Sequence, residues 1–179
     1  MRVRKLLTLI SLLLLGVWLG AAIFFSAAVA PSVFAVLRGA EVANAGALAG
    51  SIVNRLLGTI NRGGFEIALF LIITGYFTTR GQKRWARFAE MISLAIMAIM
   101  TGIGEWVITA RLSALRAAMQ LPVDQIARND PRRIAFDSLH RYSVVAMGIA
   151  VFAALVGFVF IASRNYKTGD SETPPVAGN

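Results

Sequence analysis

The sequence contains no cysteine and only one histidine among its 179 residues. The absence of cysteine excludes disulfide bonds, thiolate metal sites and cysteine nucleophiles. Charge is also scarce, because charged residues make up 15% of the chain against about 25% in soluble domains. Hydrophobic residues make up 57%. A soluble domain would not carry so many apolar residues, so we expect that they form the spans of an integral membrane protein.

The few charges that are present are mostly positive. Lysine and arginine together number 18 against 9 acidic residues, a net charge of +9. On a soluble protein this balance would suggest nucleic acid. Here the basic residues flank apolar runs and form no basic face with interleaved aromatics, so they indicate membrane topology and lipid contact and exclude nucleic-acid binding.

Four apolar runs approach the length of about 20 residues that a membrane-spanning helix needs. The first is longer than a signal-peptide core, and Pro31 would follow the cleavage site directly, so we expect a retained helix that bends at Pro31. Barrel strands are excluded, because they would alternate polar and apolar residues. The predicted spans are Leu6–Val29, Gly64–Thr79, Phe88–Ala110 and Tyr142–Ser163.

The predicted fold is an all-α integral membrane protein, a four-transmembrane-helix bundle with an amphipathic outer connection between helices 1 and 2. That connection, within residues 31–62, either lies on the bilayer or leads into the second span. Residues 1–165 form one transmembrane domain, and residues 166–179 a disordered cytoplasmic tail. All three lysines, Lys5, Lys83 and Lys167, fall on one side. The positive-inside rule then places both termini in the cytoplasm of a bacterial-type plasma (inner) membrane.

Ionisable residues gather at the predicted outer boundary of the spans. Charges at membrane depth are costly and often mark a site. We expect either a solvated rim of ion pairs or a polar pocket for a small polar or ionic ligand, with binding or transport as the function. Asp130 and Pro131 are the expected start of the last helix, where Arg133, Asp137, His140 and Arg141 share a face. The candidate ligand-binding residues are Glu66, Glu105, Asp137, His140 and Arg141.

The single histidine offers an alternative. His140 could hold haem iron or a copper ion with a methionine as the second ligand. A third alternative is a structural or interaction protein, because Gly16 and Gly20 form a GxxxG pattern that lets another helix approach closely, within the bundle or in a homo-oligomer. No nucleophile–base pair, phosphate loop or dinucleotide motif is present by spacing, so we do not expect an enzyme.

Two sequence blocks resemble a known family of membrane proteins. LGVWLGAAIFFSAAVAPSVFAVL begins at Leu15, and FDSLHRYS begins at Phe136. Together they resemble the domain of unknown function 4149 family, which is similar to a eukaryotic four-span protein linked to cisplatin resistance and distantly like copper-resistance D-type proteins. The resemblance implies a four-helix membrane protein and supplies no catalytic residues. The matching positions are Trp18, Gly20, Phe24, Phe25, Ala30, Pro31, Phe34, Phe136, His140 and Ser143.

Overall fold

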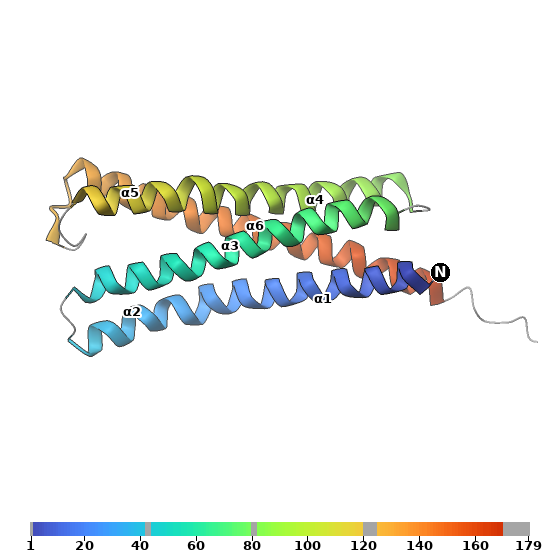
Figure 1. Ribbon diagram of the computed structural model, residues 1–179, viewed down its shortest axis with the longest axis horizontal. Helices are drawn as coiled ribbons and strands as arrows, with labels where there is room; N and C mark the ends of the chain where they lie inside the picture. Colours follow the sequence, from blue (N-terminus) through green and yellow to red (C-terminus); the bar gives the residue numbers. More distant parts are fainter. Residues whose placement is uncertain (1, 42–43, 80–81, 120–124, 170–179) are drawn as a thin grey trace, which may run out of the picture.

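The computed structural model describes residues 2–41, 44–79, 82–119 and 125–169, which form four long helical rods and no strand (Figure 1). Two of the rods contain a short π-helix, marked η. The rods are, in chain order, α1 (Arg2–Phe24) with η1 (Phe25–Val29) and α2 (Ala30–Gly39); α3 (Ala45–Thr78); α4 (Arg84–Gly102) with η2 (Ile103–Thr109) and α5 (Ala110–Met119); and α6 (Pro131–Gly169).

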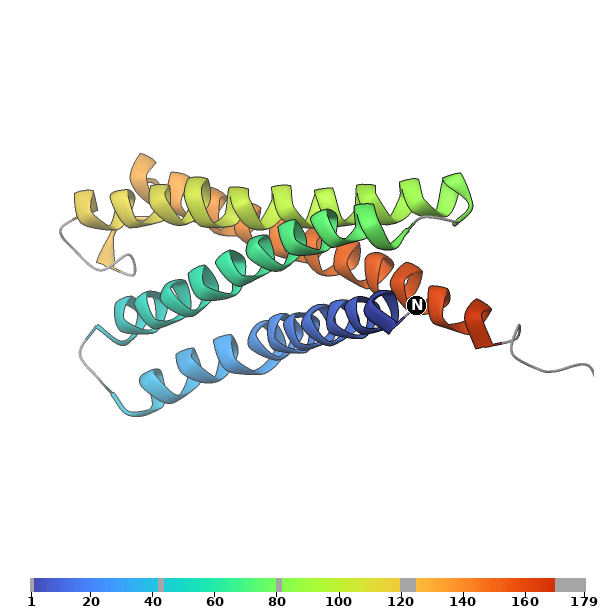
Figure 2. The same cartoon turned by 45° about the vertical axis from the view of Figure 1, so that its right-hand side comes forward.

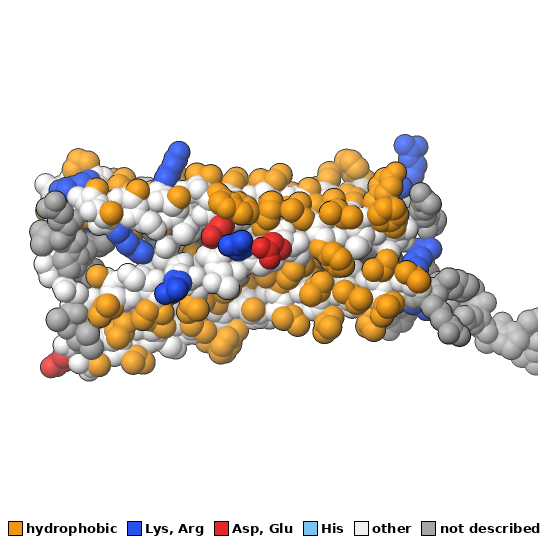
Figure 3. Space-filling view, viewed as in Figure 1, with side chains coloured by type: hydrophobic (Ala, Val, Ile, Leu, Met, Phe, Trp, Pro, Cys, Tyr) orange, Lys and Arg blue, Asp and Glu red, His pale blue; other side chains and the backbone are white. Residues whose placement is uncertain are grey.

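All four rods are long and apolar enough to cross a membrane. Their candidate spans contain 33 to 37 residues, about 50–55 Å of helix against a hydrocarbon layer of about 30 Å. Hydrophobic side chains dominate the face shown in Figure 3, and most of its basic side chains lie towards the two ends. The chain is therefore a multi-pass membrane protein with an even number of crossings, and α1 begins and α6 finishes at the same end (Figure 1). We call this the terminal end and the other the distal end.

The first rod differs from its predicted course. The chain does not leave the helix at Pro31 but continues as one helical rod to Gly39. In η1 the hydrogen bonds reach one residue further back than in an α-helix, and the N–H of Ala30 donates to the oxygen of Phe25. Pro31 then lies in the first turn of α2, where its missing N–H breaks no helical bond.

The predicted amphipathic connection is also resolved into helix. Residues 45–62 are the first half of α3 and continue without interruption into the second span. They therefore lead into the span, which was one of the two expected arrangements, and residues 30–39 belong to the first rod. A short segment after Gly39 separates the two rods. Asn44, which has a left-handed φ of 60°, directly precedes the first residue of α3.

Close packing of the first rod against α3 and α6 holds the middle of the bundle together. Trp18 is 4% exposed, and its indole Nε1 donates to the carbonyl oxygen of Ile60, 2.9 Å away. Gly64 gives the indole its space, because a Cβ at Gly64 would lie 2.7 Å from the ring. Gly16 faces Phe158 of α6 at ordinary contact distance, whereas Gly20 is exposed with nothing within 4 Å. Of the two glycines of the GxxxG pattern, only Gly16 thus packs inside the bundle.

The last rod begins as its sequence predicts. Asp130 caps α6, because its Oδ1 accepts the backbone N–H of Arg132 at 2.8 Å. The guanidinium of Arg132 also donates to the Asp130 carboxylate at 2.9 Å and holds the pKa of this carboxyl below its usual value. α6 runs to Gly169, and residues 170–179 of the predicted disordered tail lie outside the described residues.

The rods diverge at the distal end. Figures 1 and 2 both show α2 and the first half of α3 on one side, and α5 and the start of α6 on the other. Both π-helices lie near the point of divergence, since η1 begins 23 residues after Arg2 and η2 begins 19 residues after Arg84, about 28–35 Å along their rods. The packed half of the molecule thus ends where the widened turns begin, and the space beyond them is the candidate site.

Candidate functional site

A pocket of 530 Å³ occupies the wedge at the distal end. It lies between all four rods, since α2, α3, α5 and α6 each contribute lining residues. Its volume falls in the range of about 300–1,000 Å³ that is typical of small-molecule sites. The lining residues with polar, charged or aromatic side chains are Phe34, Arg38, Asn54, Arg116, Arg133, Phe136, Asp137, His140 and Ser143.

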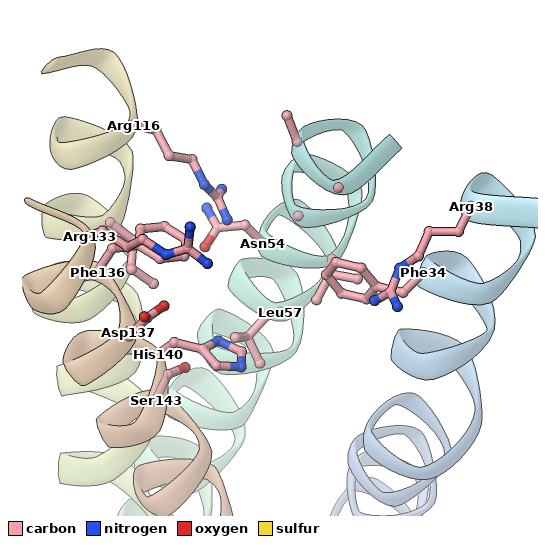
Figure 4. Close-up of a pocket in the computed structure, with 15 residues that line it drawn as sticks. Phe34, Arg38, Asn54, Leu57, Arg116, Arg133, Phe136, Asp137, His140 and Ser143 are labelled. Carbon is pink, nitrogen blue, oxygen red and sulfur yellow. The ribbon is translucent and has the colours of Figure 1, made fainter. Parts of the chain in front are cut away.

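Two arginines enter the pocket from the α5–α6 side. Arg116 of α5 is partly buried, and its guanidinium lies 5.3 Å from the ring centre of Phe136 in a cation–π contact. Arg133 comes from the first turn of α6, where its Nη1 donates to the carbonyl oxygen of Ile126 at 2.6 Å. Its Nε is buried and has no hydrogen-bond partner. In Figure 4 both guanidinium groups extend towards Asn54 of α3.

A third arginine faces them across the pocket. Arg38 of α2 lies over the ring of Phe34, with 5.7 Å between the guanidinium carbon and the ring centre (Figure 4). Neither Arg38 nor Arg116 takes part in a salt bridge within the described part of the chain. No carboxylate therefore accepts from their guanidinium N–H groups. Among the described lining residues the formal charge is three arginines minus one aspartate, an excess of two positive charges.

Asp137 and His140 line the same pocket from α6. They follow Arg133 by four and seven residues and so share its helix face, as the spacing predicts. Asp137 forms no salt bridge within the described residues, because Arg133 is engaged with Ile126 and Arg141 donates to Ser138 Oγ at 3.5 Å. The His140 ring points into the pocket towards Leu57, and the buried Ser143 lies one turn below it (Figure 4).

The structure separates the other three candidate ligand-binding residues from the pocket. Arg141 is exposed on α6 and does not line it. Glu66 lies on the outside of α3, where its carboxylate accepts from Arg62 Nε at 3.2 Å. Glu105 of η2 packs against Gly58 of α3, and its Oε2 is buried without a hydrogen-bond partner. The expected layer of five groups is therefore divided between a pocket, an outer face and a helix contact.

The described residues contain no group of three or more histidine, aspartate and glutamate side chains that could hold a metal ion. His140 has Asp137 on the same helix face, but the pocket brings no second histidine or methionine beside them.

Arg38, Asn54 and Arg116 were not predicted as site residues from the sequence. Arg38 and Asn54 lie in residues 31–62, where a connection outside the bundle was one expectation, so their helices were not predicted to face α6. Arg116 lies beyond the predicted third span, Phe88–Ala110, so it was not among the candidate residues. Only the distal extension of all four helices brings the three residues around one space. Phe34 and Phe136, the rings under Arg38 and Arg116, did stand out as positions shared with a family.

A family model described as Domain of unknown function (DUF4149) matches residues 13–120, which is more than half of the chain. Neither a curated protein nor a solved structure matches the chain significantly. The matched region contains the pocket residues of α2, α3 and α5 and ends before α6, which carries Arg133, Asp137 and His140.

Proposed function

The chain belongs to the DUF4149 family, whose description assigns no activity, and we propose that this membrane protein binds an organic anion at its distal end. One observation carries the proposal: three arginines from three different helices line a pocket that contains one carboxylate. Arginine donates two parallel hydrogen bonds to carboxylate or phosphate, and charge-assisted bonds of this kind are the strong ones. An anion in the pocket would give partners to guanidinium groups that now contact aromatic rings.

The size and lining of the pocket favour an organic ligand over a simple inorganic ion. Apolar side chains alternate with the arginines around the wall, and the volume of 530 Å³ exceeds what an inorganic ion alone needs. The apolar lining residues are Phe34, Ala47, Val53, Leu57, Leu112 and Phe136. We infer that the ligand combines a phosphate or carboxylate group with an apolar part, and that the pocket serves binding or transport without catalysis.

We infer the side of the membrane from the three lysines and from the clustering of basic residues before α4, because the total number of basic residues is similar at the two ends. Lys83, Arg84 and Arg87 lie where α4 begins, at the terminal end, and Lys5 lies at the start of α1. By the positive-inside rule this end is cytoplasmic in a bacterial-type plasma membrane, and the pocket faces the outside. Both termini are then in the cytoplasm.

His140 keeps an alternative open for the same pocket. A haem or copper group would use the imidazole that points into the space (Figure 4). This alternative stays a prediction, and binding measurements on one variant distinguish it from anion binding. Replacing His140 by alanine would abolish metal or haem binding and leave anion binding nearly unchanged.

The decisive experiment measures anion binding by the purified protein in detergent. The probes are glycerol 3-phosphate and a short-chain phosphatidic acid, with glycerol as the neutral control. Arg38→Gln and Arg116→Gln each remove one charge-assisted interaction worth about 1.5–3 kcal/mol, so the Kd should rise about 10- to 150-fold. Arg111→Gln is the matched control, because Arg111 is exposed on the same rod and does not line the pocket.

The binding affinities of these variants can contradict the proposal. If Arg38→Gln and Arg116→Gln bind the phosphate probes as tightly as Arg111→Gln, or if glycerol binds as well as its phosphate, the pocket is not an anion site. Because neither the Arg38 nor the Arg116 side chain donates a hydrogen bond to another described residue, both variants should fold normally.

A further inference from the structure

Exposed tryptophan and tyrosine side chains lie at two levels of the bundle. Tyr76 and Trp85 lie where α3 ends and α4 begins, and Trp106 of η2 and Tyr142 of α6 lie towards the distal end. All four are more than half exposed, whereas Trp18 is buried. Tryptophan and tyrosine gather at the two surfaces of the hydrocarbon layer of a membrane, so these four residues indicate where that layer begins and ends.

The two levels are one hydrocarbon thickness apart. Trp106 follows Trp85 by 21 residues along one rod, which is about 32 Å of helix against a layer of about 30 Å. Tyr142 belongs to the level of Trp106, because Ala146, one turn after it, packs in a cluster with Ile108, two residues after Trp106. The distal surface of the hydrocarbon layer is therefore near Trp106 and Tyr142.

The charged residues agree with this level. α6 carries no charged residue over the 22 positions of Tyr142–Ser163, about 33 Å of helix, and Arg141 directly precedes this run. On α3, Gly58 packs against Glu105, the neighbour of Trp106, and Arg62 lies one turn further into the layer. One turn is about 5 Å, a depth from which a long arginine side chain still reaches water.

The arginine pocket then lies just beyond the hydrocarbon, at the side of the lipid headgroups. Leu112 and Arg116 line it and follow Trp106 by six and ten residues, about 9 and 15 Å of helix. Side chains on a helix lean towards its N-terminus, which for α2 and α5 is the side of the membrane. Arg38 and Arg116 accordingly start far out on their helices and reach back towards the bilayer.

No helix packing closes the side of the pocket between α2 and α6 within the described residues. α2 packs against α3 and α5 packs against α6, whereas α2 and α6 lie on opposite sides of the wedge (Figures 1 and 2). Nearer the terminal end α1 packs against α6, so the gap begins where the packed half ends. The first rod carries no charged residue between Lys5 and Arg38. An apolar wall therefore runs from the membrane up to Phe34 in the pocket.

We propose that the anion is the phosphate group of a membrane lipid in the leaflet nearest the distal end, and that this lipid enters sideways between α2 and α6. Its phosphate binds among Arg38, Arg116 and Arg133, which supply opposite charge and parallel N–H donors. Its acyl chains stay in the bilayer along the apolar first rod. A soluble phosphate ester would make the first contact but not the second. The inference rests on the proposed anion site and adds the source of the anion.

Three probes with the same glycerol unit separate a lipid from a soluble phosphate. They are a short-chain phosphatidic acid, glycerol 3-phosphate and the diacylglycerol that carries the same chains. The phosphatidic acid should bind the purified protein at least about tenfold more tightly than either of the others. If glycerol 3-phosphate binds as tightly as the phosphatidic acid, the anion site stands and the lipid inference falls. If neither phosphate probe binds, the anion site itself is wrong.

A photoreactive side chain tests the same inference in the native membrane. Phe34→p-benzoylphenylalanine keeps an aromatic ring in the pocket, and Phe152→p-benzoylphenylalanine is the control, because Phe152 is 68% exposed on the spanning part of α6. Illumination should link a phosphate-bearing lipid to position 34. Arg116→Gln should lower this yield several-fold and leave the yield at position 152 unchanged, whereas Arg111→Gln should change neither.

Two results of this experiment would overturn the lipid inference. One is the absence of a lipid adduct at position 34 when position 152 gives one. The other is an adduct at position 34 whose yield is the same with Arg116→Gln as with Arg111→Gln, because such a lipid would only surround the protein. Either result can occur while glycerol 3-phosphate still binds the purified protein, so the lipid inference can fail without the anion site.

Discussion

Replacing Gly64 by alanine should loosen the contact that joins the first rod to α3. The added Cβ would lie 2.7 Å from Cε2 and Nε1 of Trp18, and the rigid, 4% exposed indole has no room to withdraw. Overpacking of this kind costs about 1–3 kcal/mol. Losing the 2.9 Å bond to the oxygen of Ile60 adds about 0.5–1.5 kcal/mol. Alanine returns about 0.5–1 kcal/mol through its better helix propensity, so a net loss of about 0.5–4 kcal/mol is expected.

The neighbouring glycine provides the control for this prediction. A Cβ at Gly63 would meet nothing within 4 Å, so Gly63→Ala should stabilise the helix by up to about 1 kcal/mol. The two variants carry the same chemical change one residue apart, and unfolding of the detergent-solubilised protein in sodium dodecyl sulfate, followed by circular dichroism, compares them directly. If Gly64→Ala is as stable as Gly63→Ala, the Trp18 contact does not hold the rods together.

Two further predictions concern the cap of α6 and the contact at η2. Asp130→Asn keeps a capping oxygen but removes the charge paired with Arg132, and the pKa of Asp130 lies below its usual 3.8 because Arg132 donates to it. The charge should therefore stabilise the protein fully well above the usual pKa and lose its effect as the pH falls through the lowered pKa, so the melting temperatures of the variant and the native protein should differ at pH 6 and approach each other progressively as the pH is lowered below about 4; a difference that does not shrink over this range would contradict the prediction. Gly104→Ala places a Cβ 2.7 Å from Nδ2 of Asn61, which is 3% exposed, and should cost about 1–3 kcal/mol. Adding Asn61→Ala should recover part of that loss, and an additive double variant would show that the two sites do not touch.

The membrane-spanning part of the fold could be predicted from the sequence because its cause is local. Long uncharged runs are stable within the lipid bilayer. Asp130 marks a helix start by its capping carboxylate, and Pro131 does so by its fixed φ and missing N–H. The sequence predicted a bend at Pro31, whereas the helix continues through this residue, and the reason is physical. The sequence shows that it lacks an N–H, but not that a π-helix on its N-terminal side can place it where no N–H is needed.

The candidate site was predictable only where its residues share a helix. The spacing of Arg133, Asp137 and His140 places them on one face, and all three line the pocket. Glu66 and Glu105 have similar heights but point in other directions, because height follows from counting residues whereas direction depends on which neighbours the helix packs against. Arg38 and Arg116 lie on opposite sides of the same pocket (Figure 4) only through packing between rods that are distant in sequence, which no local pattern records.

The two π-helices divide the molecule into parts that can change separately. A π-turn is a recognised bending point in a helix, and here one interrupts each of two rods at the boundary between the closely packed half and the wedge. Movement of α2 or α5 about these points would alter the width of the pocket while Trp18, Gly64 and the core below them stay in place. In such a movement the closely packed half would be the fixed base, and a ligand that contacts both Arg38 and Arg116 would favour the narrower wedge.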